Sequence, residues 1–171
     1  LQDPLEAGVL PLRVTHNDTK RNNVLRDEKT GRALCVIDLD TVMPGLAAYD
    51  FGDAIRFGAS TALEDETDLD KVHFSLPYYR AFAEGYLEAF GSRLNEAELL
   101  SLPMGAKLMT LEVGIRFLGD YLNGDVYFKV DHSEHNLVRA RTQLTLLQEM
   151  EAHWQEMNEI VRELGKGRSK A

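Results

Sequence analysis

The chain has 171 residues, of which 44% are hydrophobic and 27% charged, and this composition is typical of a folded globular protein rather than a disordered one. Its 28 acidic side chains outnumber 19 basic ones, so the formal net charge of −9 argues against general nucleic-acid binding, and a nucleotide would need a metal ion to shield its phosphates. No apolar run of about 18 residues could span a membrane, and the single cysteine cannot form an internal disulfide, so we expect a cytoplasmic protein.

The first elements expected in chain order are the two strands of a β-hairpin. Short apolar runs at 22–25 and 33–37 flank the polar, glycine-containing segment 26–32. The second run places Cys35 at a strand position that we expect to be buried, where it would be an inert structural residue. This run ends abruptly at Asp38.

After the hairpin the sequence predicts a solvated acidic run at 64–70 and then helices. Pro77 is suited to the first turn of a helix. The aromatic residues that follow recur at every fourth position: Tyr78, Phe82, Tyr86 and Phe90. This stripe is expected to face the core. Asn95 with Glu98 resembles a capping box at the start of a long apolar helix, which is expected to stop at Asn123-Gly124.

The last predicted element is a single long helix. Asp131 with Glu134 is expected to cap it, and apolar residues at spacings of three and four predict about 30 residues of continuous helix up to Leu164. Residues 1–164 should therefore form one mainly α-helical domain with a small β-hairpin near its start. The basic residues 165–171 are expected to form a flexible tail.

Polar residues cluster between His16 and Asp53, where His16-x-Asp18-x-x-x-x-Asn23 is followed by Asp38 at the end of the apolar strand. A loop carboxylate can orient a hydroxyl group and accept its proton, while an amide and a second carboxylate offer oxygens to a hard cation such as Mg²⁺. A base, an amide and a carboxylate at this spacing match the template for phosphoryl transfer. Asp and Asn residues in loops usually cap turns, but the combination favours the catalytic interpretation.

The same residues carry a resemblance to a known group of enzymes. The stretches 15–25, 36–40 and 49–53 resemble the catalytic elements of the aminoglycoside phosphotransferase and choline kinase superfamily. A closer resemblance, to N-acetylhexosamine 1-kinases, spans residues 11–155 and rests on these stretches: 15–20, 38–45, 49–56, 116–125, 127–129 and 135–137. Such kinases phosphorylate the anomeric hydroxyl of N-acetylglucosamine or N-acetylgalactosamine with ATP.

The resemblance implies the C-terminal lobe of a protein-kinase-like fold, in which the hairpin carries the catalytic loop and the enzyme uses ATP and Mg²⁺ on a small-molecule acceptor. Asp18 would be the catalytic base that orients the acceptor hydroxyl, and Asn23 and Asp38 would be the magnesium ligands. Lys20 would reach the transferring phosphate, where its positive charge would stabilise the transition state, unless it is a solvent-facing loop lysine.

Supporting roles are expected for three more polar residues. His16 is better suited to donate a hydrogen bond that orders the loop than to shuttle protons, and Asp50 would tie down the loop backbone. Asp40 lies two positions past Asp38 and on a strand would share its face, behind the metal ligands.

On the acceptor side, Arg116 and Tyr127 resemble the residues expected to contact the sugar. Arg116 could instead pair with Glu112, one helical turn earlier, and the sequence leaves both readings open.

The nucleotide site of this superfamily lies between two lobes, and these residues contain neither the phosphate-covering loop nor the lysine of the smaller N-terminal β lobe. We therefore expect a C-terminal half that binds Mg-ATP weakly on its own. Aminoglycosides, homoserine and choline are the alternative acceptors, since the acidic run at 64–70 could attract cationic groups. A non-catalytic kinase-like binding module and a metal-dependent hydrolase also stay open, although the sequence offers no separate nucleophile for the hydrolase.

Overall fold

The structure is a computed structural model that describes residues 1–166. The α-helices are α1 Gln2–Glu6, α2 Ala47–Gly58, α3 Leu76–Phe90, α4 Glu96–Leu122, α5 His135–Ala152 and α6 Trp154–Lys166. The strands are β1 Arg13–Thr15, β2 Val24–Arg26, β3 Ala33–Val36 and β4 Met43–Gly45. Single 3₁₀ turns are η1 Arg21–Asn23, η2 Leu39–Thr41, η3 Leu69–Lys71 and η4 Gly91–Arg93. No helix within residues 1–166 combines the length and the apolarity that crossing a bilayer requires.

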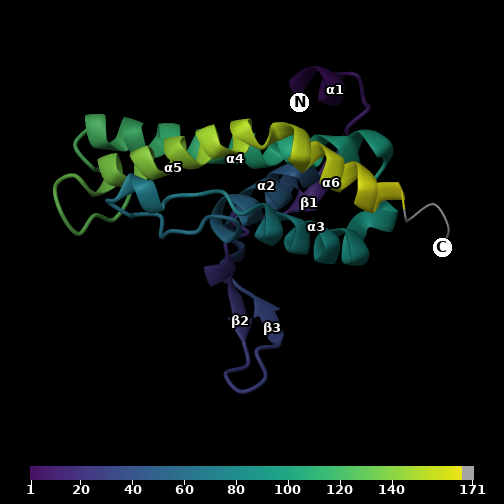
Figure 1. Cartoon of the computed structure of the whole chain (residues 1–171), viewed down its shortest axis with the longest axis horizontal. Helices are drawn as coiled ribbons and strands as arrows, with labels where there is room; N and C mark the ends of the chain where they lie inside the picture. Colours follow the sequence, from purple (N-terminus) through teal and green to yellow (C-terminus); the bar gives the residue numbers. More distant parts are fainter. Residues whose placement is uncertain (167–171) are drawn as a thin grey trace.

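The long helices pack together into one body, and a β-hairpin projects from it (Figure 1). Helix α4 lies against α2, α5 and α6, while α3 lies against α2 and α6. Most of the largest fully buried apolar side chains come from α2 to α6: Phe51, Ile55, Tyr79, Leu102, Leu146, Met150, Met157 and Val161. Burial of these side chains is the main driving force for the fold, and it fixes α2, which lies under the candidate site.

The hairpin prediction is confirmed. Strand β2 pairs antiparallel with β3, and Val24 lies opposite Val36. A second antiparallel pair, β1 with β4, places Arg13 opposite Gly45 and was not predicted. The prediction that Cys35 is buried is wrong, because all four residues of β3 are exposed on a hairpin that stands away from the helices (Figure 1).

Helices α2 and α4 touch through their backbones. A Cβ atom added at Gly52 would collide with the carbonyl of Gly105, and one added at Gly105 would collide with the carbonyl of Ala48. Only glycine allows two helices to approach this closely. The contact holds α2 rigidly against the longest helix of the body.

The prediction that the aromatic stripe of α3 faces the core is confirmed only in part. Tyr86 is partly buried and packs against the core, with its ring centre 5.2 Å from that of Phe51. Tyr78 is 58% exposed and Phe82 is 38% exposed. The buried residues of this helix are its neighbours on the adjacent face: Tyr79, Ala83 and Leu87. The hydroxyl of Tyr79 donates a hydrogen bond to the carbonyl of Met157 at 3.3 Å, so contact with α6 sets the rotation of α3.

The capping box that opens α4 is confirmed. The side chain of Asn95 accepts a hydrogen bond from the backbone N–H of Glu98, and Glu98 accepts one from the N–H of Asn95, both at 2.8 Å. Arg13 of β1 donates two further hydrogen bonds of 2.8 Å to the Glu98 carboxylate, which ties the β1–β4 pair to the helical body. The helix ends at Leu122, before Asn123-Gly124, as predicted.

The prediction of one continuous helix up to Leu164 is wrong, because α5 and α6 meet at a break at His153. The break lets α5 follow α4 while α6 crosses onto α3. Asp131 does not cap α5 either, since the helix begins at His135 and the Asp131 backbone N–H donates to Nδ1 of His135 at 3.1 Å. Of the predicted tail 165–171, the first two residues belong to α6 and the rest lie outside the described residues.

Candidate active site

The loop that carries the polar motif is held on the first turn of α2. Both carboxylate oxygens of Asp50 accept backbone N–H groups, from His16 at 2.9 Å and from Asn17 at 2.8 Å. The hydroxyl of Thr19 donates to the Asp50 carbonyl at 2.6 Å. Three contacts to one residue fix the backbone around Asp18, as we expected for Asp50.

His16 joins the loop to the end of the hairpin. Its Nε2 lies 2.9 Å from the carbonyl oxygen of Ile37, and its Nδ1 accepts the backbone N–H of Asp18 at 3.3 Å. A neutral ring with its proton on Nε2 makes both contacts at once. The hydroxyl of Thr41 also donates to the His16 carbonyl at 2.6 Å. With both ring nitrogens engaged in this way, His16 orders the loop.

Asp18 is the centre of the polar cluster. Its Oδ2 accepts hydrogen bonds from Lys20 Nζ at 2.8 Å and from Asn23 Nδ2 at 2.7 Å. Within residues 1–166 no donor bonds to its other oxygen, Oδ1, and the side chain is 25% exposed. One carboxylate oxygen is therefore fixed and the other is available to a ligand.

Asn23 and Asp38 flank the end of the hairpin, Asn23 just before β2 and Asp38 two residues after β3. Asn23 is buried, and its carbonyl accepts the backbone N–H of Ile37, the residue before Asp38, at 2.9 Å. Asp38 has a left-handed backbone with φ of 64° and is exposed. The side-chain amide nitrogen of Asn23 points to Asp18, so the amide oxygen of Asn23, Oδ1, points away from Asp18. Asn23 and Asp38 each offer an oxygen of the kind that a hard cation binds together with water.

The expectation that Asp40 shares a strand face with Asp38 is wrong. Strand β3 ends at Val36, the left-handed turn at Asp38 redirects the chain, and Asp40 lies in the 3₁₀ turn η2. Alternation of side chains applies only along an extended strand. Asp40 is exposed.

A cavity of about 310 Å³ adjoins Asp18 and Lys20. The opposite wall comes from α4 and the segment after it. Arg116 lines this cavity, pairs with Glu112 at 3.6 Å, and places its guanidinium 5.4 Å from the centre of the Tyr127 ring and 5.3 Å from that of Phe128. Both readings of Arg116 therefore have support, because it forms the ion pair and also faces the cavity. Tyr127 itself is 71% exposed and does not line the cavity, but its ring lies against two residues that do, Arg116 and Phe128.

Asp120 holds this second wall, a role that sequence reasoning missed. Its carboxylate accepts the backbone N–H groups of Val126 and Tyr127 at 3.0 and 2.9 Å, and that of Phe128 at 2.9 Å. The side chain of Asn136 donates to it at 2.9 Å. Although burial alone would raise the pKa of Asp120, these hydrogen bonds lower it overall. The sequence did offer one indication of this role, because Asp120 is a carboxylate within an apolar helix just before Asn123-Gly124.

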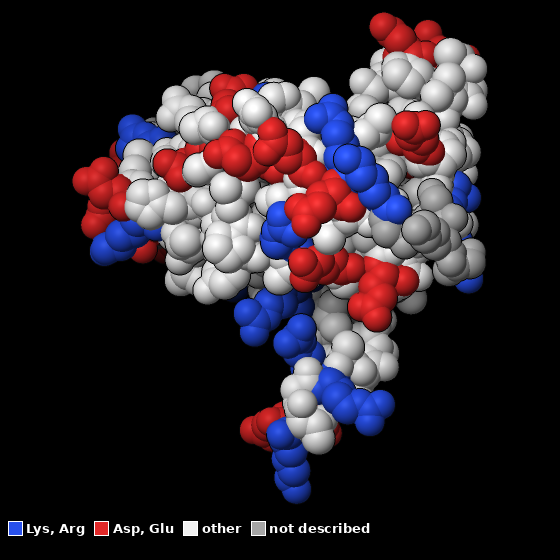
Figure 2. All heavy atoms as spheres, turned by 45° about the vertical axis from the view of Figure 1, so that its right-hand side comes forward, with Lys and Arg blue, Asp and Glu red and all other residues white. Residues whose placement is uncertain are grey.

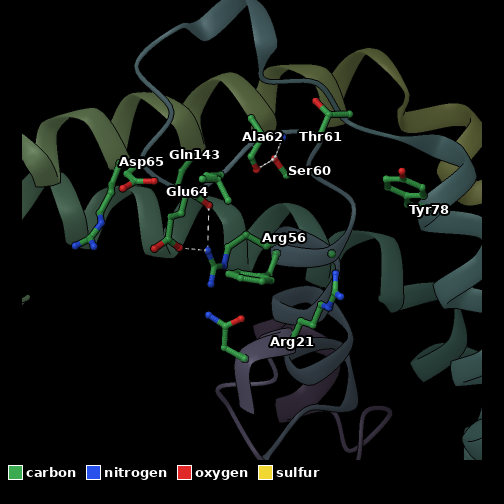
Figure 3. A pocket seen from close by; sticks show the side chains of 14 residues that line it. Arg21, Arg56, Ser60, Thr61, Ala62, Glu64, Asp65, Tyr78 and Gln143 are labelled. Atoms are coloured by element: carbon green, nitrogen blue, oxygen red, sulfur yellow. Dashed lines mark hydrogen bonds and ion pairs between the residues drawn. The ribbon is translucent and has the colours of Figure 1, made fainter. Parts of the chain in front are cut away.

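A second missed feature is the charged cluster of α2. Arg56 is 5% exposed and lies between Asp53, at 2.9 Å, and Glu64, at 2.6 Å. Burial favours a lower pKa for Arg56, but the two carboxylates outweigh it and raise the pKa, so Arg56 stays charged. Figure 3 shows Arg56 between Glu64 and Gln143 in the wall of a larger, open cavity of about 680 Å³. This cavity shares Arg56, Glu64 and Arg139 with the smaller one.

The surface charge is uneven despite the net charge of −9. Lys and Arg side chains predominate on the projecting hairpin and at its base, whereas acidic side chains are prominent on the helical body in the view of Figure 2. An anionic ligand beside the hairpin would therefore not face a uniformly acidic surface.

The site places a partly exposed carboxylate and a lysine beside a cavity, and a buried asparagine holds the carboxylate, which is an arrangement that phosphoryl transfer can use. The family model described as Phosphotransferase enzyme family, APH, matches residues 1–93, just over half of the chain. The chain belongs to this family. The matched region includes the whole of the polar loop, the hairpin and α2.

Proposed function

We propose that the protein is an ATP-dependent kinase that phosphorylates the anomeric hydroxyl of an N-acetylhexosamine. The observation that carries this proposal is the state of the Asp18 carboxylate, whose Oδ2 is fixed by Lys20 and Asn23 while Oδ1 is left to accept a proton. The residues described make up the C-terminal lobe of a protein-kinase-like fold in this account.

In the proposed reaction the acceptor hydroxyl donates a hydrogen bond to Asp18 Oδ1. Its oxygen attacks the γ-phosphorus of ATP, the bond to the β,γ-bridging oxygen breaks, ADP leaves, and the hydroxyl proton passes to Asp18. Lys20 is 34% exposed and lies 2.8 Å from Asp18, so its ammonium group can turn to the transferring phosphoryl group and neutralise charge there.

Asn23 and Asp38 would hold Mg²⁺ in this proposal. Bound there, the ion would shield the phosphates and stabilise charge on the leaving ADP. Within residues 1–166 no group of three or more His, Cys, Asp or Glu side chains could hold a metal ion, so the ion would need ligands from the nucleotide as well. A site of one amide and one carboxylate oxygen matches the way Mg²⁺ binds together with nucleotide phosphates.

The lining of the smaller cavity favours a neutral acceptor. It carries five cationic side chains and four carboxylates, together with the apolar side chains of Met109, Val113, Phe117 and Phe128. An aminoglycoside carries several positive charges and would meet repulsion there. A sugar presents hydroxyl groups that donate and accept hydrogen bonds, and mixed charges with aromatic surface suit it. Arg116 would contact the sugar, and the Tyr127 ring, which lies against the Arg116 guanidinium, would help to hold it in place.

An N-terminal β lobe would complete the enzyme. The hairpin and the turn after it expose large apolar side chains beside the proposed metal ligands: Leu25, Leu34, Val36, Ile37, Leu39 and Val42. Exposed apolar patches of this kind mark interaction surfaces. In this proposal the β lobe and the base of the nucleotide cover the patch, and ATP is held between the lobes.

An acceptor panel tests the proposal. ADP release by the full-length protein would be followed with Mg-ATP and N-acetylglucosamine, N-acetylgalactosamine, kanamycin, homoserine or choline. We expect release with the acetylated sugars and an anomeric phosphate by phosphorus NMR. ADP release with a cationic acceptor alone would show that the proposed substrate is wrong and the proposed kinase reaction is right. No ADP release with any acceptor would favour a binding module. Phosphate release without ATP would indicate a hydrolase.

A further inference from the structure

Two buried polar atoms at the acceptor cavity lack partners. Asp53 is 3% exposed, and its Oδ2 accepts no hydrogen bond from any described residue. Nε of Arg139, on α5, is buried and donates none. Both residues line the cavity that also holds Asp18. Buried polar groups are nearly always paired, so two unpaired groups in the lining of one cavity, on α2 and α5, point to a ligand that pairs them.

The two side chains are otherwise firmly held. Asp53 Oδ1 accepts hydrogen bonds from Arg56 at 2.9 Å, and Arg139 donates from Nη1 to the Lys129 carbonyl at 3.1 Å and to Asn136 at 3.3 Å. The Arg139 guanidinium also lies 5.4 Å from the centre of the Phe117 ring. The unpaired acceptor and the unpaired donor are therefore fixed features of the wall.

These atoms require opposite chemistry from a ligand. Asp53 Oδ2 needs a hydrogen-bond donor and Arg139 Nε needs an acceptor. A secondary amide supplies an N–H and a C=O that point in opposite directions, and Val113, Phe117 and Phe128 in the same cavity offer apolar surface for a methyl group. An acetamido group has all three parts.

We propose that Asp53 and Arg139 form the subsite that binds the acetamido group of the acceptor, with its N–H donated to Asp53 Oδ2 and its carbonyl accepting from Arg139 Nε. This inference rests on the proposed sugar kinase function, and it would explain how the enzyme selects N-acetylated sugars over sugars that lack the acetamido group. Glu64 shares Arg56 with Asp53 and is 27% exposed.

The test compares N-acetylglucosamine with glucose, which has the same anomeric hydroxyl but no acetamido group. The full-length protein would be assayed for kcat/KM with both sugars as wild type, Asp53→Asn, Arg139→Lys and Asp70→Asn. Asp53→Asn keeps an oxygen for Arg56 but replaces an acceptor with a donor. Arg139→Lys keeps the charge but removes Nε. Asp70 lies on the exposed turn η3 and serves as the charge-matched control.

We expect wild type to prefer N-acetylglucosamine by about 10- to 100-fold, as for one or two buried hydrogen bonds. Each subsite variant should bring this ratio to within about threefold of one, because kcat/KM falls more for N-acetylglucosamine than for glucose, and Asp70→Asn should keep the wild-type ratio. An unchanged ratio in both variants, or equal losses with both sugars, would overturn the acetamido subsite. Wild type that phosphorylates neither sugar would refute the proposed function itself. If Asp53→Asn does not fold, judged by thermal unfolding, Arg139→Lys decides alone.

Discussion

The side-chain amide of Asn23 donates to Asp18 Oδ2 at 2.7 Å, so the proposed base and a proposed magnesium ligand are coupled by one hydrogen bond. The same amide group also donates to the Asp18 carbonyl at 2.8 Å. Asn23 is buried, and it therefore holds both the side chain and the backbone of Asp18 in place.

Replacing Asn23 by Ala should remove a metal ligand and release the Asp18 carboxylate. We expect kcat to fall by at least about 100-fold and the Mg²⁺ concentration for half-maximal rate to rise, since an outer contact to a ligand alone is worth about 10- to 100-fold. The measurement is ADP release against Mg²⁺ concentration. The neighbouring exposed residue gives the matched control, Asn22→Ala, which should behave as wild type. A normal Mg²⁺ dependence in Asn23→Ala would exclude Asn23 as a ligand.

Arg116→Ala should raise KM for the acceptor sugar by about tenfold or more with a smaller effect on kcat, because the contact exists before and during transfer. KM for ATP should stay within about twofold, since the residue lines the acceptor cavity and lies on α4. Arg141→Ala removes an exposed arginine from α5 and should change neither value. Equal effects on both substrates would show that Arg116 acts only through its ion pair with Glu112.

Gly105→Ala should destabilise the protein by about 1–3 kcal/mol or more, because the added methyl group has no space against α2. Gly119→Ala in the same helix is the matched control. Nothing lies within 4 Å of a Cβ atom at Gly119, so this change should stabilise the helix by about 0.5–1 kcal/mol. Urea unfolding measures both. Equal stabilisation by the two changes would contradict the close approach of α2 and α4.

Stability should depend on the charge of Glu98 below neutral pH. Burial would raise the pKa of Glu98, but hydrogen bonds from Arg13 and Asn95 and the charge of Arg13 lower it overall, below its ordinary value of 4.5. A pKa lower in the folded than in the unfolded state contributes stability above the ordinary value, and this contribution disappears as the pH falls through the folded pKa.

Glu98→Gln keeps the capping contact and removes the charge, so it should cost about 1 kcal/mol at pH 7. The gap between wild type and variant should shrink steadily from about pH 5 to pH 3, as the wild-type carboxylate becomes protonated. Urea unfolding at several pH values measures the gap. A gap that does not change over this range would mean that the Arg13–Glu98 pair does not stabilise the fold.

The sequence predicted those parts of the fold that depend on interactions between residues close together in the chain. The β2–β3 hairpin and the Asn95–Glu98 capping box depend on residues within about a dozen positions. The β1–β4 pair joins Thr15 to Met43 across a long connection and left no local pattern. The break at His153 carries no glycine or proline and follows from which helices α5 and α6 contact.

The candidate site divides in the same way. The spacing from His16 to Asp38 allowed the polar loop to be recognised, and the structure brings Asp18, Lys20 and Asn23 together. The Asp53–Arg56–Glu64 cluster and the Asp120 anchor were missed, because their meaning depends on burial and on backbone groups distant in sequence. The periodicity of apolar residues along a helix does not reveal which of its charged residues will be buried by other parts of the fold.

The most direct test of the account is the turnover of Asp18→Asn with Mg-ATP and N-acetylglucosamine. Asparagine keeps the shape of the side chain but cannot accept the hydroxyl proton, so kcat should fall by about 100- to 10,000-fold while KM for the sugar changes little. Asp70→Asn serves again as the charge control, and unfolding curves should show that both variants fold. A loss of activity in Asp18→Asn alone is the result the account predicts. Retention of kcat within about threefold of wild type would contradict the role of Asp18 as the base.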